Sequence, residues 1–204
     1  MLKPLVSLLA AVACALATPS AYADQTIVFL RHGEKPALGL GQLDCQGLNR
    51  ALALPPVLLA KFGTPSAIYA PDPGAKAKDK GIEYNYVRPL ATIEPTAIRL
   101  GMPVNTSFGR FQSQQLVGEL LKPANRDATI FVAWEHNLAV LAAQHLVASI
   151  GGDANQVPPW RSDDFDSLYV IHVKWQHGKP VLVRFAREAE GLDHQSVECP
   201  GAHP

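Results

Sequence analysis

The chain has 204 residues and carries 18 basic and 18 acidic side chains, so its formal net charge is zero. Such neutrality argues against a nucleic-acid partner held by broad electrostatics. The sequence has no internal repeat, no low-complexity tract and no linker long enough to divide it, and its length suits one domain with a core of its own.

The first 23 residues have the order of regions that is typical of a secretory signal peptide. A short basic start, Met1–Lys3, precedes an almost wholly apolar stretch over residues 4–18, and Ala21-Tyr22-Ala23 then gives an A-x-A cleavage pattern. We therefore expect residues 1–23 to be a cleaved signal peptide. Residues 24–204 would then form a single exported domain, either periplasmic or secreted.

Two alternatives for this N-terminal segment are weaker. A membrane anchor needs an apolar run of roughly 20 residues, whereas Thr18-Pro19-Ser20 interrupts the run in this chain. Lipidation at Cys14 is disfavoured because the residues before it, Ala11-Val12-Ala13, include no leucine. We expect no stable membrane insertion once the signal peptide has been removed.

Cleavage after Ala23 removes one lysine and no acid, which leaves 17 basic against 18 acidic residues and a net charge of −1. It also leaves two cysteines, Cys45 and Cys199. In an oxidising compartment such a pair indicates a possible disulfide, which would tie the C-terminal tail to an early loop. Two unrelated thiols are the alternative.

Strand-like and helix-like segments alternate along the chain. The alternation predicts an α/β three-layer sandwich, in which helices flank a mostly parallel sheet and a C-terminal hairpin adds antiparallel strands. In chain order, we expect a strand over 26–30, a helix over 47–62 broken or kinked at Pro55-Pro56, a strand over 66–69, a Pro/Gly/Lys loop over 71–81, helices over 89–100 and 113–121, a strand over 129–134, a helix over 138–150, and hairpin strands over 168–175 and 181–187.

Polar residues follow two of these predicted strands directly. Arg31-His32 comes after the strand at 26–30, and Glu135-His136 comes after the strand at 129–134. Ligands of parallel α/β sheets bind beyond the carboxyl ends of the strands. If the two strands are parallel neighbours, both imidazoles emerge at the same edge of the sheet.

These residues resemble the histidine phosphatase superfamily, whose members have the phosphoglycerate mutase-like fold. The family signature is an R-H-G motif after the first strand, here Arg31-His32-Gly33-Glu34. A second arginine opens a helix with the pattern R-x-x-x-T-x-E-P-x-A, here starting at Arg88, and a second histidine follows a later strand, here His136. The resemblance covers nearly the whole chain after the signal peptide, which would place it in an exported, bacterial-type branch.

The resemblance implies that His32 is the nucleophile that becomes phosphorylated. It also implies that Arg31, Arg88 and His136 form the phosphate pocket and take part in catalysis. We expect no metal and no other cofactor, because the arginines would neutralise the substrate. The remaining histidines show no metal-ligand spacing, which also argues against a metal site.

Physical chemistry supports these roles independently. The planar fork of arginine can bind two phosphate oxygens at once and stays charged at any working pH. Phosphoryl transfer needs positioning, charge stabilisation and a nucleophile in line with the leaving oxygen. A neutral imidazole is such a nucleophile, and neighbouring guanidiniums should help to keep His32 unprotonated. His136 would donate a hydrogen bond to a phosphoryl oxygen that gains charge in the transition state.

The general acid is the part of the site that the sequence does not supply. Many family members have a glutamate on a loop after the second arginine, or an aspartate directly after the second histidine. In this chain residues 101–112, where that loop would lie, include no acid, and Asn137 follows His136 and cannot protonate a leaving alkoxide. Glu34 and Glu135 are weak candidates. Glu34 fits a supporting or helix-capping role at least as well, and Glu135 fits a residue that orients an arginine or a solvent-facing loop carboxylate equally well. An insertion of about fifteen residues before Arg88 also departs from the family pattern.

The sequence therefore predicts a metal-independent phosphatase that hydrolyses a small phosphomonoester or phosphorylated group through a phosphohistidine on His32. The alternative is a non-catalytic protein that keeps the pocket and binds phosphate or another anion, which the missing acid favours. A phosphosugar mutase is a weaker alternative, because the acid-bearing loop is missing and export separates the protein from glycolytic substrates. The substrate and the oligomeric state are left open.

Overall fold

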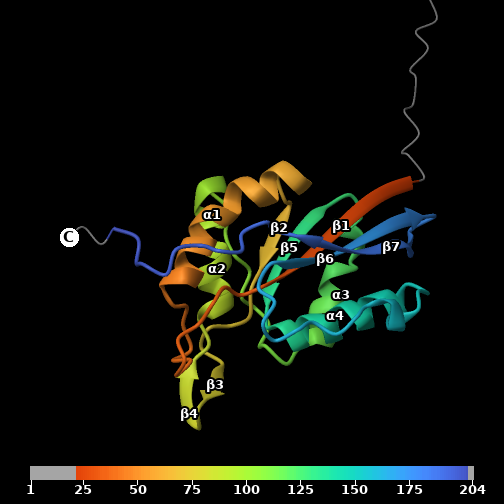
Figure 1. The fold of residues 1–204 in the computed structure, drawn as a ribbon. Helices are drawn as coiled ribbons and strands as arrows, with labels where there is room; N and C mark the ends of the chain where they lie inside the picture. Colours follow the sequence, from red (N-terminus) through yellow and green to blue (C-terminus); the bar gives the residue numbers. More distant parts are fainter. Residues whose placement is uncertain (1–21, 202–204) are drawn as a thin grey trace, which may run out of the picture.

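A five-stranded mixed sheet lies at the centre of the protein, with the strand order β2-β5-β1-β6-β7 (Figure 1). The computed structural model describes residues 22–201, so residues 1–21 of the predicted signal peptide lie outside the described residues. β5 pairs in parallel with both β1 and β2, whereas β6 pairs antiparallel with β1 and β7. The strands are β1 (Tyr22–Arg31), β2 (Ala67–Tyr69), β5 (Thr129–Trp134), β6 (Ser167–Gln176) and β7 (Lys179–Ala189).

Helices cover both faces of this sheet, which makes three layers (Figure 1). One face packs against α1 (Cys45–Phe62) and α2 (Arg88–Leu100), and the other against α3 (Ser113–Leu120) and α4 (His136–Ser149). The predicted α/β class, with its parallel strands, flanking helices and C-terminal antiparallel hairpin, is confirmed. Among the described residues, no helix is long and apolar enough to cross a membrane.

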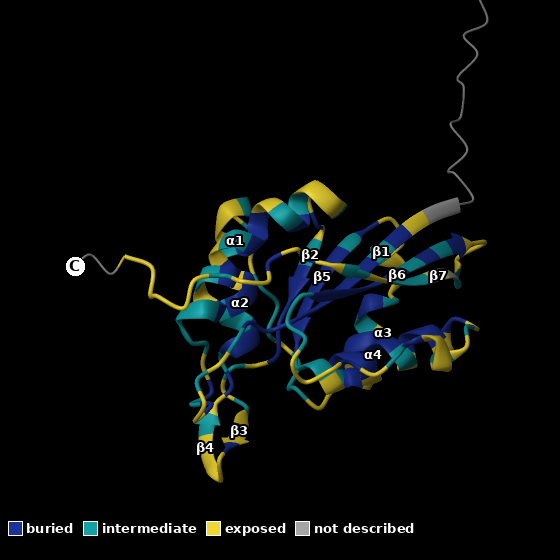
Figure 2. Ribbon diagram, viewed as in Figure 1, coloured by how far each residue is buried: buried dark blue, intermediate teal, exposed yellow. Residues whose placement is uncertain are grey.

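The alternation of side chains along β1 explains why the sheet is covered on both faces. Ile27 and Phe29 pack in the cluster on the α3–α4 side, whereas Val28 and Leu30 pack in the cluster on the α1–α2 side. All four side chains are fully buried. A strand that is buried on both faces is a continuous apolar run in the sequence, and Figure 2 shows the central strands as the most buried part of the fold.

The first helix continues through Pro55 and Pro56, so of the predicted break or kink at these residues the break is wrong. Each proline lacks the N–H that would donate to the preceding turn. Leu54 and Leu58, on either side of the pair, are fully buried against the sheet. Tertiary packing of this face therefore outweighs the local cost of the two prolines.

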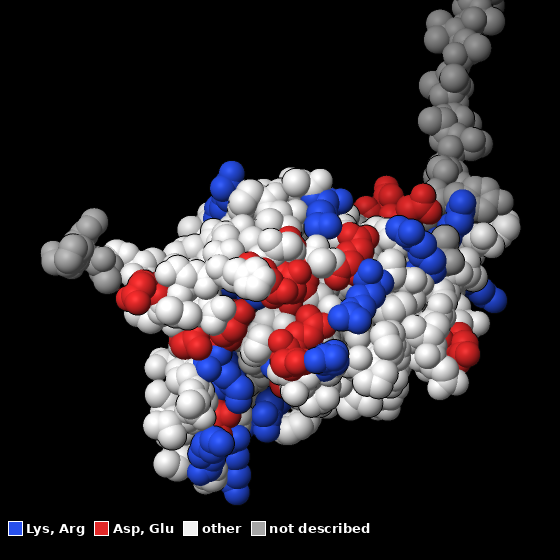
Figure 3. Space-filling model, in the orientation of Figure 1, with Lys and Arg blue, Asp and Glu red and all other residues white. Residues whose placement is uncertain are grey.

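The predicted loop over 71–81 is wrong in part, because much of it forms a β-hairpin. β3 (Lys76–Asp79) pairs antiparallel with β4 (Ile82–Asn85), and the hairpin projects from the body of the protein beyond α2 (Figure 1). Basic side chains gather on it (Figure 3). Its turn at Lys80-Gly81 has positive φ at both residues, a conformation that favours glycine at the second of them.

The C-terminal tail is attached to the first turns of α1. Cys45 and Cys199 are joined by a disulfide, and their Cα atoms are 4.6 Å apart. Asn49 Nδ2 donates to the carbonyl oxygens of Ser196 and Glu198, at 2.8 and 2.7 Å. The tail therefore lies along the helix that follows the R-H-G motif.

Candidate active site

The two polar clusters that end β1 and β5 begin at the same edge of the sheet. β1 and β5 are parallel neighbours, and Arg31 is in register with Trp134, the last residue of β5. The backbone N–H of His32 extends this pairing, since it donates to the carbonyl oxygen of Trp134 at 3.1 Å. Arg31-His32 and Glu135-His136 therefore leave adjacent strands side by side.

The turn after His32 is locked between α1 and α2. The N–H of Gly33 donates to Thr92 Oγ1 at 2.9 Å, and this hydroxyl donates in turn to the carbonyl oxygen of Arg88 at 2.8 Å. A Cβ on Gly33 would lie only 2.9 Å from the Cα and carbonyl oxygen of Gly47 in α1. Glycine is therefore required here by the close approach of two backbones.

His32 is a buried, neutral imidazole with one nitrogen available for chemistry. The residue is 2% exposed, and its Nδ1 lies 2.8 Å from the carbonyl oxygen of Gly33. Because a carbonyl oxygen only accepts hydrogen bonds, Nδ1 carries the proton and the Nε2 lone pair is left free. Burial, and then the positive charges of Arg88 and Arg31, lower the pKa of His32 to about 3.

This lowered pKa predicts a pH dependence of stability. Below the ordinary histidine pKa of 6.5, the unfolded chain binds a proton at His32 that the folded protein does not bind until about pH 3. Between pH 6 and 4, His32 should therefore lower the free energy of unfolding by about 1.4 kcal/mol for each unit that the pH falls. Urea unfolding of the wild type and His32→Asn across this range measures the effect. Parallel pH dependences in the two proteins would contradict the prediction.

Arg31 is held in place by a loop that precedes β6. Its Nη1 donates to the carbonyl oxygens of Arg161, Ser162 and Asp164, at 3.3, 3.0 and 2.7 Å. The Phe165 ring packs under the guanidinium, 3.8 Å from Cζ to the ring centroid. All of these partners are uncharged groups, so the positive charge of Arg31 is fixed in position without being neutralised by them.

Arg88 is the first residue of α2, and its charge is paired with the β3–β4 hairpin. Its Nη1 donates to Asp79 Oδ2 at 2.6 Å, and Asp79 also accepts from the N–H of Gly41 at 2.9 Å. Both ionic side chains are buried, with Arg88 4% and Asp79 9% exposed. The inserted hairpin thus supplies the counter-ion of the second arginine.

His136 and Glu135 form a close pair at the start of α4. His136 Nδ1 lies 2.5 Å from Glu135 Oε1, and Glu135 caps the helix by accepting from the N–H of Leu138 at 3.0 Å. Burial raises the pKa of Glu135, but the contact with His136 and the backbone hydrogen bonds outweigh it and bring the pKa to about 2. An ionised carboxylate of this kind is poorly suited to act as a general acid.

Glu34, the other weak candidate for the general acid, points into a separate ionic cluster. Its carboxylate binds the guanidinium of Arg50, with the shortest contact at 2.7 Å from Nη2 to Oε1. Arg50 is 1% exposed and also contacts Glu190, Asp166 and Asp193. The contacts of Glu34 are those of a residue that anchors the turn after His32.

Two further residues belong to this neighbourhood, Tyr86 beside His32 and Arg110 beside Tyr86. Neither was among the residues predicted for the site. The fully buried Tyr86 ring is edge-on to His32, with ring centroids 6.2 Å apart. The guanidiniums of Arg88 and Arg110 lie over this ring, with Cζ at 4.8 and 5.5 Å from its centroid.

Four buried donors around His32 have no hydrogen-bond partner within residues 22–201. They are the Nε atoms of Arg31, Arg88 and Arg110 and the Tyr86 hydroxyl. Burial raises the pKa of Tyr86, so its hydroxyl stays protonated and can donate. Buried donors are nearly always satisfied in folded proteins, and this concentration of them beside a neutral imidazole is suited to a ligand that only accepts hydrogen bonds, such as an oxyanion.

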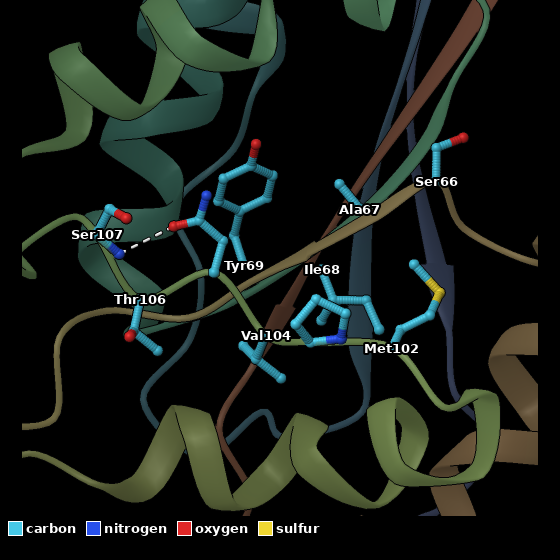
Figure 4. A pocket seen from close by; sticks show the side chains of 10 residues that line it. Ser66, Ala67, Ile68, Tyr69, Met102, Val104, Thr106 and Ser107 are labelled. Atoms are coloured by element: carbon cyan, nitrogen blue, oxygen red, sulfur yellow. Dashed lines mark hydrogen bonds between the residues drawn. The ribbon is translucent and has the colours of Figure 1, made fainter.

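A separate pocket lies at the edge of the sheet, between β2 and residues 102–107 (Figure 4). It is lined by Ser66–Tyr69 and Met102–Ser107, and Tyr69 is its only titratable side chain. None of the predicted site residues lines it. In the described part of the chain, no group of three or more His, Cys, Asp or Glu side chains is placed to hold a metal ion.

Comparison with solved structures identifies the fold. A mycobacterial glucosyl-3-phosphoglycerate phosphatase in complex with inorganic phosphate superposes with a TM-score of 0.53 at 16% identity, over 79% of this chain and 95% of the other. The protein histidine phosphatase SixA in complex with tungstate superposes with a TM-score of 0.52 at 12% identity, over 81% and 97%. The chain has the histidine phosphatase fold.

The resemblance inferred from the sequence is thereby confirmed at the level of the fold. No family model matches the sequence, and no curated protein matches it. These identities show the fold alone. The activity of this histidine phosphatase-fold protein has to be inferred from the residues around His32.

Proposed function

We propose that the protein is a phosphatase that works through a phosphohistidine on His32. The state of the His32 side chain is the observation that best supports this proposal. Its Nδ1 donates a hydrogen bond to the Gly33 carbonyl oxygen, and its Nε2 lone pair is free and lies near arginine side chains. Nε2 attacks phosphorus, an N–P bond forms and the bond from phosphorus to the leaving oxygen breaks. Water then attacks the phosphohistidine, the N–P bond breaks and phosphate is released.

The arginines and His136 would stabilise the charge of the transferring phosphoryl group. Among residues 22–201, Arg31 brings a positive charge that only carbonyl groups contact through Nη1, and Arg88 retains an unpartnered Nε beside its pair with Asp79. Donors of this kind are effective when they are fixed in advance at the place where charge develops. The chemistry proposed here needs no metal ion, because the guanidiniums carry the charge compensation.

The leaving group should be a good one. Glu34 is bound to Arg50, the pKa of Glu135 is about 2, and Asn137 cannot supply a proton as a carboxylic acid does. Without a strong general acid, departure of an alkoxide is slow, whereas phenolates or a nitrogen leaving group can depart with little help. We propose a small, activated phosphorylated substrate, and an exported location, periplasmic or secreted, after removal of residues 1–23.

The experiment is a leaving-group series with residues 24–204, purified with the disulfide intact. We expect turnover of aryl phosphates, with kcat/KM falling steeply as the pKa of the leaving phenol rises. Rapid quenching should trap a phosphoenzyme that is stable to alkali and labile to acid, on a peptide that contains His32. Turnover without that intermediate would contradict the mechanism.

A non-catalytic binding protein is the second candidate. It is favoured because Glu34 is bound to Arg50 and Glu135 to His136, so neither carboxylate is available as a general acid. Calorimetry separates the two. Binding of inorganic phosphate, together with no turnover of even the most activated aryl ester, would support the binding protein.

A further inference from the structure

Arg110 is a charged residue beside the candidate active site for which the proposed function has no use. It lies in the segment between α2 and α3. Its Cζ is 5.5 Å from the centroid of the Tyr86 ring, and the centroid of that ring is 6.2 Å from that of His32. Arg110 and His32 therefore both lie next to the Tyr86 ring.

The backbone of Arg110 is fixed to the sheet. Its carbonyl oxygen accepts from Trp134 Nε1 at 3.0 Å, and Trp134 is the fully buried last residue of β5. The guanidinium also lies over the ring of Phe111, with Cζ 4.3 Å from the centroid. Arg110 thus reaches Tyr86 from the segment that leads into α3, whereas Arg88 reaches it from α2, on the other side of the sheet.

The charge of Arg110 has no acidic partner among residues 22–201. Arg88 is paired with Asp79, and Arg50 with four carboxylates, but no carboxylate lies within ion-pair distance of Arg110. Its Nε is buried and has no hydrogen-bond partner. Arg110 as a whole is half-buried, but its buried Nε–H costs free energy unless a ligand supplies an acceptor.

We infer that Arg110 binds a second anionic group of the substrate, at a subsite next to Tyr86. The substrate class is then a small phosphorylated molecule that carries a further carboxylate or phosphate. A guanidinium fork can bind either group through two parallel hydrogen bonds. This inference rests on the proposed function only in placing the transferred phosphoryl group at His32, Arg31 and Arg88.

The test uses phosphonates, because their C–P bond is not hydrolysed and binding can be measured without turnover. Phosphonoacetate and its three- and four-carbon homologues, which end in a carboxylate, are compared by calorimetry with unsubstituted alkyl phosphonates of equal chain length. Alkane diphosphonates of matching length distinguish a second phosphate from a carboxylate. We expect one chain length to bind at least about tenfold more tightly than its singly anionic counterpart.

Arg110→Gln should reduce this preference to within about twofold, and Arg110→Lys should retain part of it because the charge remains. Arg126→Gln is the matched control: it removes the same charge from an exposed position before the start of β5, and it should retain the full preference. Thermal unfolding of each variant establishes that it is folded.

Two results would overturn the inference. One is that no doubly anionic phosphonate is preferred at any chain length. The other is that Arg110→Gln weakens the singly and doubly anionic ligands equally, which would place Arg110 on the phosphoryl group itself. Failure of the proposed function is a different result, namely the absence of aryl phosphate turnover and of a phosphoenzyme, and it leaves the binding preference measurable.

Discussion

His32→Asn is expected to lose at least about a thousandfold of the aryl phosphatase activity, because a covalent mechanism without its nucleophile retains only what binding and charge stabilisation contribute. Asparagine suits the test because its side-chain amide can still donate to the Gly33 carbonyl, as Nδ1 of His32 does at 2.8 Å. The loss should appear in kcat. Steady-state kinetics with an aryl phosphate measures it, and the phosphoenzyme should be absent from the quenched variant.

The matched control for this variant is His145→Asn. His145 is an exposed histidine of α4, so its replacement changes the same functional groups away from the candidate site. We expect its kcat to be within about twofold of the wild type. If His32→Asn retained comparable activity, while His145→Asn and the wild type behaved alike, another residue would have to be the nucleophile.

The parts of the site that follow from the sequence are those determined by local pattern. The apolar run before Trp134 predicted a strand over 129–134, and β5 has those bounds. The helix that begins with Arg88 ends at Gly101, which has the left-handed conformation that glycine favours. Because Arg31-His32 lies at the end of β1 and Glu135-His136 follows β5, their meeting at one edge of the sheet required only that the strands be parallel neighbours.

Other parts of the site depend on contacts that local pattern does not encode. Asp79 falls in a stretch whose Pro, Gly and Lys residues are typical of a loop, and its pairing with Arg88 exists only because the β3–β4 hairpin places Asp79 at the first residue of α2. The position of Arg110 depends on its carbonyl contact with Trp134. Glu34 follows the R-H-G motif, but its partner Arg50 has no motif of its own, and the anchoring role emerges only in three dimensions.

Arg50 carries the largest expected effect on stability. It is 1% exposed, and its guanidinium lies 2.7 Å from Glu34 and 2.8 Å from Glu190, with Asp166 and Asp193 both at 3.3 Å. Arg50→Met keeps a long side chain in the core but leaves these carboxylates without their cation. Since breaking a buried ion pair by removing one partner strands the other charge, we expect a loss of about 3–5 kcal/mol in the free energy of unfolding at pH 7.

The pH dependence of this loss separates stranded charge from lost packing. Burial, and then the neighbouring Asp166 and Glu34, already raise the pKa of Glu190, although Arg50 opposes the shift. Without Arg50 the pKa of the buried Glu190 rises further, so folding requires this carboxyl to bind a proton that the unfolded chain has released. The deficit of Arg50→Met relative to the wild type should therefore grow as the pH rises from 5 to 8.

Urea unfolding at several pH values measures the deficit. The matched control is Arg99→Met, at an exposed arginine of α2, which should lower the free energy of unfolding by less than about 0.5 kcal/mol. A deficit in Arg50→Met that does not change with pH would indicate that only packing has been lost.

Because Glu34 is separated from His32 by Gly33 alone, the charge effect should also reach the candidate site. At pH 8, Arg50→Met should lose aryl phosphatase activity even under conditions in which the variant remains folded. Without the Arg50 guanidinium, the carboxylate of Glu34 no longer anchors the turn after His32.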